Sequence, residues 1–229
     1  MFSKPVHQQI LRILQALNAN LLRDCHAYFG GGTQLVLEFG EYRQSQDIDF
    51  LCPFGQGYTQ LRRAIFDSGY DALFDDRLGF QFPRDIRADQ YGIRFPIQTE
   101  AYLIRFEIVA EGRIAFDPPQ QLDWCPVACL SRVDAIAEKL LANSDRWADP
   151  STFVRDLIDL AMLRVQSPFP TTAITKAEAA YPVIVPLQRA LQHWQSYPDV
   201  RDRCFEHLQI QQSDLILEGL DRLTVEYLE

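Results

Sequence analysis

Residues 28–50 read YFGGGTQLVLEFGEYRQSQDIDF, and this stretch decides the fold. Its last part, DIDFLC over residues 47–52, has the β-branched and aromatic character of a strand. Asp47 and Asp49 would point to the same face of that strand, where two neighbouring carboxylates repel each other. A divalent cation removes this conflict, and Mg²⁺ prefers one or two protein carboxylates together with phosphate oxygens and water. The spacing therefore predicts a site for a metal and a triphosphate, and the alternative is an exposed strand end with solvated aspartates.

A glycine turn precedes the strand. Gly30, Gly31 and Gly32 are followed by Thr33. Backbone N–H groups in such a turn can approach an anion closely, and Thr33 adds a hydroxyl donor. The turn predicts phosphate-binding donors near the metal site, whereas the simpler interpretation is a plain turn.

Two polar residues lie just before the strand. Arg43 and Ser45 could contact phosphate or brace the loop. For Arg43 the alternative is a salt bridge at the protein surface, and the sequence favours neither interpretation.

We expect a third carboxylate on a neighbouring strand, and Glu107 in AYLIRFEIVA (residues 101–110) is the best candidate. Alternation places Ile104 and Phe106 on one face of this strand and Arg105 and Glu107 on the other. An unpaired charge in the middle of an apolar strand is costly. Either Arg105 pairs with Glu107, or a metal ion does.

The first half of the chain reads as a mixture of helices and strands. Helical periodicity covers residues 6–27 and 58–68, while residues 34–40 could be a strand or a short helix. Strand-like segments between residues 71 and 116 suggest a meander or a mixed sheet; they are ALF (72–74), LGFQF (78–82), YGIRFPI (91–97) and AYLIRFEIVA (101–110).

After the proline-rich break FDPPQQL (116–122) the chain becomes helical. Residues 129–147 and 151–165 have strong helical periodicity, and Asp149 with Pro150 gives the second segment a start signal. We predict an α+β fold with an α/β part over residues 1–120 and a helical part over residues 121–229. The break could equally be a loop within one shared core.

The composition of the 229 residues is that of an ordinary globular protein, with 47% hydrophobic residues. No segment approaches the ~18 apolar residues of a membrane span, and the N-terminus lacks the features of a signal peptide. We therefore expect a cytoplasmic protein without membrane contact.

The net charge of −9 argues against tight, non-specific binding to nucleic acid. The five cysteines lack the spacing of a zinc site and are expected to be free, mostly buried thiols.

Two separated motifs give the chain a resemblance to a known family. Residues 30–50, GGGTQLVLEFGEYRQSQDIDF, resemble the first motif of the AbiEii/AbiGii-type nucleotidyltransferase toxins, a branch of the DNA polymerase β-like superfamily. Residues 138–163, EKLLANSDRWADPSTFVRDLIDLAML, resemble the family's later motifs, in the same order. The resemblance implies a polymerase β-like mixed sheet with flanking helices, followed by a helical C-terminal part that completes the cleft.

The resemblance also implies roles for individual residues. Asp47 and Asp49 would hold Mg²⁺ or Mn²⁺, with Glu107 as third ligand and base. The other implied residues bind or support the nucleotide: Gly31, Gly32, Thr33, Arg43, Ser45, Lys139, Asp156 and Asp159. Asp156 and Asp159 are three residues apart and so share a helix face. The alternatives are a solvated Lys139 and an ion pair between Asp159 and Arg155.

The activity implied by the resemblance is nucleotidyl transfer. An acceptor hydroxyl on RNA such as tRNA, or on a protein, would attack the α-phosphate of a nucleoside triphosphate. The toxin role implies an antitoxin protein as partner. Two rivals remain: a non-catalytic nucleotide-binding protein on the same fold, and an interaction protein in which the carboxylates are incidental.

Overall fold

A computed structural model describes residues 2–77 and 79–229 of the chain. It divides into two compact units. The first comprises Met1–Leu37 and Gln46–Ser131, and the second comprises Glu38–Ser45 and Arg132–Glu229. The second unit thus begins at Arg132 and also takes in the short segment that precedes the Asp47 strand.

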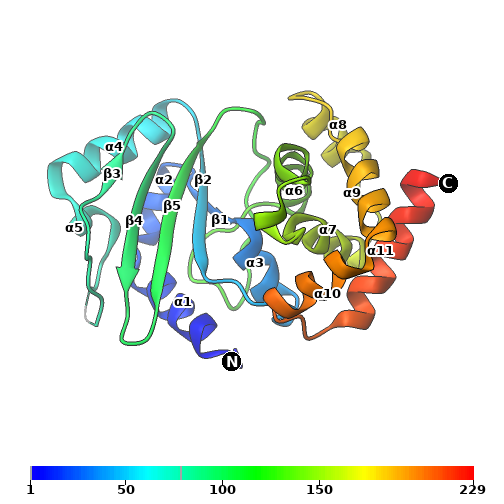
Figure 1. The fold of residues 1–229 in the computed structure, drawn as a ribbon. Helices are drawn as coiled ribbons and strands as arrows, with labels where there is room; N and C mark the ends of the chain where they lie inside the picture. Colours follow the sequence, from blue (N-terminus) through cyan, green and yellow to red (C-terminus); the bar gives the residue numbers. More distant parts are fainter. Residues whose placement is uncertain (1, 78) are drawn as a thin grey trace. The chain divides into compact units, whose positions relative to one another are not determined.

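A mixed sheet forms the centre of the first unit (Figure 1). Within the described residues its order is β1-β2-β5-β4-β3. The strands are β1 (Tyr28–Gly30), β2 (Asp47–Pro53), β3 (Arg87–Ala88), β4 (Gly92–Gln98) and β5 (Leu103–Glu111). β2 and β5 run parallel, and the other neighbours are antiparallel. The predicted mixed sheet, the strand at 47–52 and the α+β class are confirmed.

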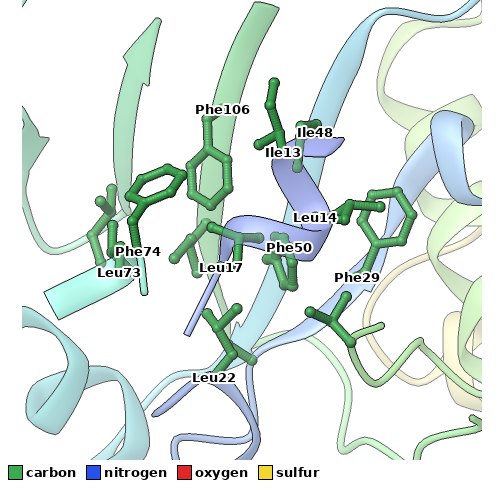
Figure 2. Close-up of a cluster of buried hydrophobic side chains, with 14 of the residues drawn as sticks. Ile13, Leu14, Leu17, Leu22, Phe29, Ile48, Phe50, Leu73, Phe74 and Phe106 are labelled. Atoms are coloured by element: carbon green, nitrogen blue, oxygen red, sulfur yellow. The ribbon is translucent and has the colours of Figure 1, made fainter. Parts of the chain in front are cut away.

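One face of this sheet carries the hydrophobic core. Ile48 and Phe50 of β2 and Phe106 of β5 are fully buried there, together with Ile13 and Leu14 (Figure 2). The helices that contribute to this core are α1 (Pro5–Ala16), α2 (Ala19–Asp24), α3 (Gly31–Glu38), α4 (Gln56–Ser68) and α5 (Tyr70–Leu73). Side chains alternate along a strand. Asp49, between Ile48 and Phe50, therefore faces away from the core, as do Arg105 and Glu107 on either side of Phe106.

The N-terminal helix is interrupted where the sequence predicts continuity. Leu17 is extended, and Asn18 caps α2 by accepting a hydrogen bond from the Leu21 N–H at 3.0 Å. Asparagine favours this role over a helix interior because its side chain competes for backbone groups. The prediction of a single helix over residues 6–27 is therefore wrong.

The strand-like segments between residues 71 and 116 behave differently from one another. The last two form β4 and β5. ALF (72–74) is wrong as a strand, because Ala72 and Leu73 belong to α5, which starts directly after Gly69 ends α4. Of LGFQF, residue 78 lies outside the described residues, and Gln81 makes a single bridge to Gln98. Residues 34–40 are mainly helical, within α3 (Gly31–Glu38).

The second unit is helical in its described residues. Its α-helices are α6 (Arg132–Arg146), α7 (Arg155–Gln166), α8 (Thr171–Glu178), α9 (Ile184–Ser196), α10 (Pro198–His207) and α11 (Ser213–Leu228). α11 packs so closely on α7 that a Cβ at Gly219 would lie 2.2 Å from the Ala161 carbonyl oxygen. The helix at 132–146 confirms the prediction for residues 129–147.

The start signal for α7 is misplaced. The Asp149 side chain caps the 3₁₀ turn η1 (Pro150–Thr152) by accepting from the Ser151 N–H. Phe153 and Val154 then take left-handed conformations before α7 begins at Arg155. Asp149 and Pro150 thus start a short turn and not the long helix.

The segment Glu38–Ser45 is tied to the second unit by backbone contacts. The Gln44 N–H donates to the Leu208 carbonyl at 2.7 Å, and the Gln211 N–H donates to the Tyr42 carbonyl at 3.0 Å.

All five cysteines are free and buried, as the sequence indicates. We find no helix with the length and hydrophobicity of a membrane span within residues 2–77 and 79–229.

Candidate active site

The pair Asp47 and Asp49 lies on the sheet face opposite the core. In the parallel pairing of β2 with β5, Asp47 is the partner of Arg105 and Asp49 is the partner of Glu107. Paired residues of neighbouring strands share a face, so all four side chains lie together. The predicted placement of Glu107 on a strand next to that of Asp47 and Asp49 is confirmed.

The glycine turn lies directly against the second aspartate. Gly30 pairs with Asp49 across β1 and β2, and β1 leads without a loop into α3 (Figure 1). Gly31 has a φ of +71°, and a Cβ at this position would lie 2.9 Å from Oδ2 of Asp49. Only a glycine lets the backbone pass this close to the carboxylate. The first N–H groups of α3, which lack partners within the helix, therefore start beside Asp49.

The other members of the turn have different surroundings. A Cβ at Gly30 would lie 2.6 Å from the Leu130 side chain, so this glycine is required by packing. Thr33 is fully buried in the first turn of α3. Gly32 precedes it in the same turn.

Arg105 lies among the three carboxylates of this face. Its Nη2 is 2.9 Å from Oδ2 of Asp47 and 3.9 Å from Oδ1 of Asp49, and its Nη1 is 4.0 Å from Oε2 of Glu107. Arg94 of β4 also donates to Oε1 of Glu107 at 2.6 Å. Among the described residues no three His, Cys, Asp or Glu side chains are already grouped as a metal cage.

The donor set nevertheless fits a divalent cation. Carboxylate oxygens are the ligands that Mg²⁺ prefers, and a positive group already contacts all three. Because Gly31 has no Cβ, the start of α3 can lie directly against the Asp49 carboxylate.

The predicted residues of the second unit form a buried ion network. Asp159 accepts from Tyr42 at 2.7 Å, from Arg43 at 2.7 and 2.8 Å, and lies 2.7 Å from the Lys139 Nζ. A carboxylate offers about four lone-pair sites, so these contacts occupy all of them. Neither alternative from the sequence holds: Lys139 is only 5% exposed, and Asp159 pairs with Arg43 and Lys139 instead of Arg155.

Asp156 completes this network from one turn earlier in α7. It contacts Lys139 at 3.0 Å and receives two hydrogen bonds from Arg146, at 2.6 and 2.9 Å.

Arg43 is buried, with only 3% of its surface exposed. The alternative of a salt bridge at the protein surface is therefore wrong for Arg43. Ser45 is partly buried at the end of the same segment.

The electrostatics of this network favour the charged forms. Burial alone would raise the pKa of the Asp159 carboxyl, but Arg43 and Lys139 hold it below its usual value. Burial likewise opposes ionisation of Asp156, and Lys139 and Arg146 lower the pKa of that carboxyl. Burial and the neighbouring Asp159 raise the pKa of Tyr42, which stays protonated and can donate.

Three of these residues have roles that the sequence did not suggest. Arg146 and Tyr42 join the network, and Arg105 contacts the DxD pair as well as Glu107. A signal for Arg146 exists, since it lies seven residues after Lys139 on one helix and so near the same face. Tyr42 offers no comparable pattern.

A protein-family model matches most of the chain. Residues 12–184 match the family described as "Nucleotidyl transferase AbiEii toxin, Type IV TA system". The chain belongs to the AbiEii nucleotidyltransferase family. The match spans both the glycine turn with its DxD strand and the Lys139-to-Asp159 helices, and the chain is accordingly a nucleotidyltransferase.

Solved structures to which this chain is similar come from two organisms. A crystal structure from H. pylori, assigned as a nucleotidyltransferase, has a TM-score of 0.56 at 18% identity, covering 97% of this chain and 96% of that one. JHP933 from Helicobacter pylori (16% identity, covering 88% and 100%) and an antigenic nucleotidyltransferase-like protein from Paracoccidioides brasiliensis (14%, covering 94% and 98%) both have a TM-score of 0.40. The first likeness supports the fold alone. Comparison with curated proteins gives no match.

The contact between Gly31 and Asp49 leads to a prediction. Gly31→Ala strains a residue at φ +71° and pushes a Cβ against Asp49, so it should lower both stability and nucleotide affinity. Gly69→Ala is the matched control, because Gly69 has a φ of +58° with nothing within 4 Å of the added Cβ. Both variants should lose about 1–3 kcal/mol of stability from backbone strain, measured by denaturant unfolding. Only Gly31→Ala should weaken the binding of a fluorescent nucleotide, and equal binding by both would contradict the prediction.

Proposed function

We propose that Asp47, Asp49 and Glu107 hold Mg²⁺ or Mn²⁺, and that the protein transfers a nucleoside monophosphate from an NTP to an acceptor hydroxyl. The observation that carries this proposal is the approach of Gly31 to Asp49, at 2.9 Å for an added Cβ. This approach supports the proposal because the turn that would bind phosphate and the carboxylate that would bind the metal lie in direct contact. Neither a plain turn nor a solvated strand end requires this approach.

The chain's own groups would divide the work as follows. The N–H groups at the start of α3 would receive the triphosphate, since a helix N-terminus favours anions. The bound cations supply Lewis-acid stabilisation of the charge that develops on the phosphate oxygens. The acceptor oxygen forms a bond to the α-phosphorus, the bond from that phosphorus to the pyrophosphate oxygen breaks, and Glu107 takes the hydroxyl proton. Positioning and electrostatics of this kind are sufficient for phosphoryl chemistry.

For the second unit we propose a supporting role built on Lys139. Asp156 and Asp159 hold its ammonium group on two sides, at 3.0 and 2.7 Å. Three cations, Lys139, Arg43 and Arg146, face these two carboxylates. We propose that Lys139 contacts a nucleotide phosphate and that Arg43 and Ser45 brace their segment.

The acceptor and the partner are also proposals. We propose RNA such as tRNA, or a protein, as the acceptor. Family membership supports an antitoxin protein as partner. The net charge of −9 favours an acceptor that is recognised locally over one bound along an extended basic surface. The alternative function is a non-catalytic nucleotide-binding module, which would bind NTP without turnover.

The test is a transfer assay with each labelled NTP, Mg²⁺ and total cellular RNA or protein. The native chain should transfer label from at least one NTP, and EDTA should stop the reaction. The Asp47→Ala/Asp49→Ala variant should transfer none. Equal labelling by the native chain and this variant would refute the active-site assignment, and nucleotide binding without transfer to either pool would favour the alternative.

A further inference from the structure

We propose that Arg105 is a built-in competitor for the metal: its guanidinium bridges the carboxylates until a divalent cation, arriving with the nucleotide, displaces it. This inference rests on the proposed metal site at Asp47, Asp49 and Glu107. It assigns Arg105 the role of coupling metal binding to nucleotide binding.

The geometry of the bridge supports this role. Arg105 is the cross-strand partner of Asp47, and its guanidinium contacts Asp47 at 2.9 Å, Asp49 at 3.9 Å and Glu107 at 4.0 Å. The Arg105 guanidinium thus contacts the same three carboxylates that would bind the metal. It relieves the repulsion that the Asp47–Asp49 spacing creates on this face of the strand.

The exposure of Arg105 makes the exchange feasible. Its side chain is 54% exposed, whereas the side chains of Asp49 and Glu107 are 24% and 15% exposed. A half-exposed ion pair contributes little to stability because solvent screens it, so breaking it is easy. The buried pairs of Asp159, by contrast, could not open without leaving charges without partners.

Arg94 shows why Arg105 and not another cation would leave. Arg94 donates to Glu107 at 2.6 Å, and it also lies 3.5 Å from Asp89. It contacts only one of the three carboxylates and can remain as a hydrogen-bond donor when a metal binds the others. Arg105 alone among the described residues bridges from β5 to both aspartates of the DxD pair.

Displacement would also give Arg105 a second task. A guanidinium released from the carboxylates remains close to the site and can bind phosphate oxygens in bidentate fashion. Metal alone would then have to break the bridge without compensation, whereas metal with a triphosphate would offer Arg105 a new partner. The apparent affinity for free metal is the intrinsic affinity multiplied by the fraction of molecules whose carboxylates are not bridged.

The test measures Mn²⁺ binding by the full chain without nucleotide, using calorimetry and the EPR signal of free Mn²⁺. Arg105→Gln should bind Mn²⁺ about two- to fivefold more tightly than the native chain, as expected when a competing ion pair of at most about 1 kcal/mol is removed. Adding a non-hydrolysable NTP should tighten Mn²⁺ binding in the native chain and much less in Arg105→Gln. Arg62→Gln is the matched control, because Arg62 is exposed on α4, and it should behave as the native chain.

The outcomes separate this inference from the function on which it rests. If Asp49→Asn abolishes Mn²⁺ binding but Arg105→Gln binds no more tightly than the native chain, the competitor role is wrong and the metal site stands. If no variant shows Mn²⁺ binding that depends on Asp49, both proposals fail. Arg105→Lys keeps the charge without the planar fork and should give an intermediate affinity, which keeps the test decisive if Arg105→Gln folds poorly.

Discussion

Replacing Asp49 by asparagine is expected to lower the rate of nucleotidyl transfer about a thousandfold while leaving the fold intact. The substitution keeps the shape of the side chain and removes its charge. A metal ion contributes several kcal/mol of transition-state stabilisation, and about 4 kcal/mol corresponds to a factor of about 10³. Asp49 also lies against the glycine turn, so under the proposed function its substitution would affect both metal binding and phosphate binding.

The stability of this variant should change little. Asp49 is 24% exposed and its contact with Arg105 is long, at 3.9 Å, so the loss should be about 1 kcal/mol or less. Asp67→Asn, at an exposed position of α4, is the matched control and should retain full activity. Initial rates with saturating NTP and Mg²⁺, with denaturant unfolding alongside, provide the measurement. A rate within tenfold of the native value would show that Asp49 is not a metal ligand.

The grouping of Asp47, Asp49 and Glu107 on one face of the sheet could be predicted because its signals are local. The two-residue period of a strand places Asp47 and Asp49 on one face, and the same period places Glu107 opposite the buried Phe106. Pairing of the two strands then follows from their apolar faces, which must share one core. The direct contact of Gly31 with Asp49 could not be predicted, since it depends on β1 pairing with β2 in one particular register.

The ion network of the second unit shows where sequence reasoning stops. Arg43 and Asp159 are 116 residues apart, and no pattern in the chain pairs them. The nearest basic neighbour of Asp159, Arg155, is the obvious partner by helix spacing and is not the one used. The segment Glu38–Ser45 packs with helices that are far from it in sequence. Tertiary contacts between buried charged groups, and not local propensity, decide this packing. The break at Asn18 and the turn at Asp149 are smaller examples of the same kind.

Asp159→Asn is expected to destabilise the protein by about 3–5 kcal/mol, as the loss of one member of a buried ion pair commonly does. The carboxylate holds Arg43, Lys139 and Tyr42, and its side chain is 0% exposed. Without its charge, Arg43 would remain buried with no carboxylate in contact. Asp221→Asn on the exposed face of α11 is the control and should change stability by less than about 0.5 kcal/mol.

The pH dependence gives this prediction a second readout. The pKa values of Asp156 and Asp159 are lowered by folding, so their stabilisation is fully present above the unfolded value near 3.9 and is lost as pH falls below it. The native chain should therefore lose stability steeply below about pH 4, and Asp159→Asn should show a shallower slope there. Unfolding midpoints between pH 2.5 and 7 test this. A variant as stable as the native chain at pH 7 that binds nucleotide poorly would instead assign Asp159 to the nucleotide pocket, because a residue needed only for folding cannot lose binding while keeping stability.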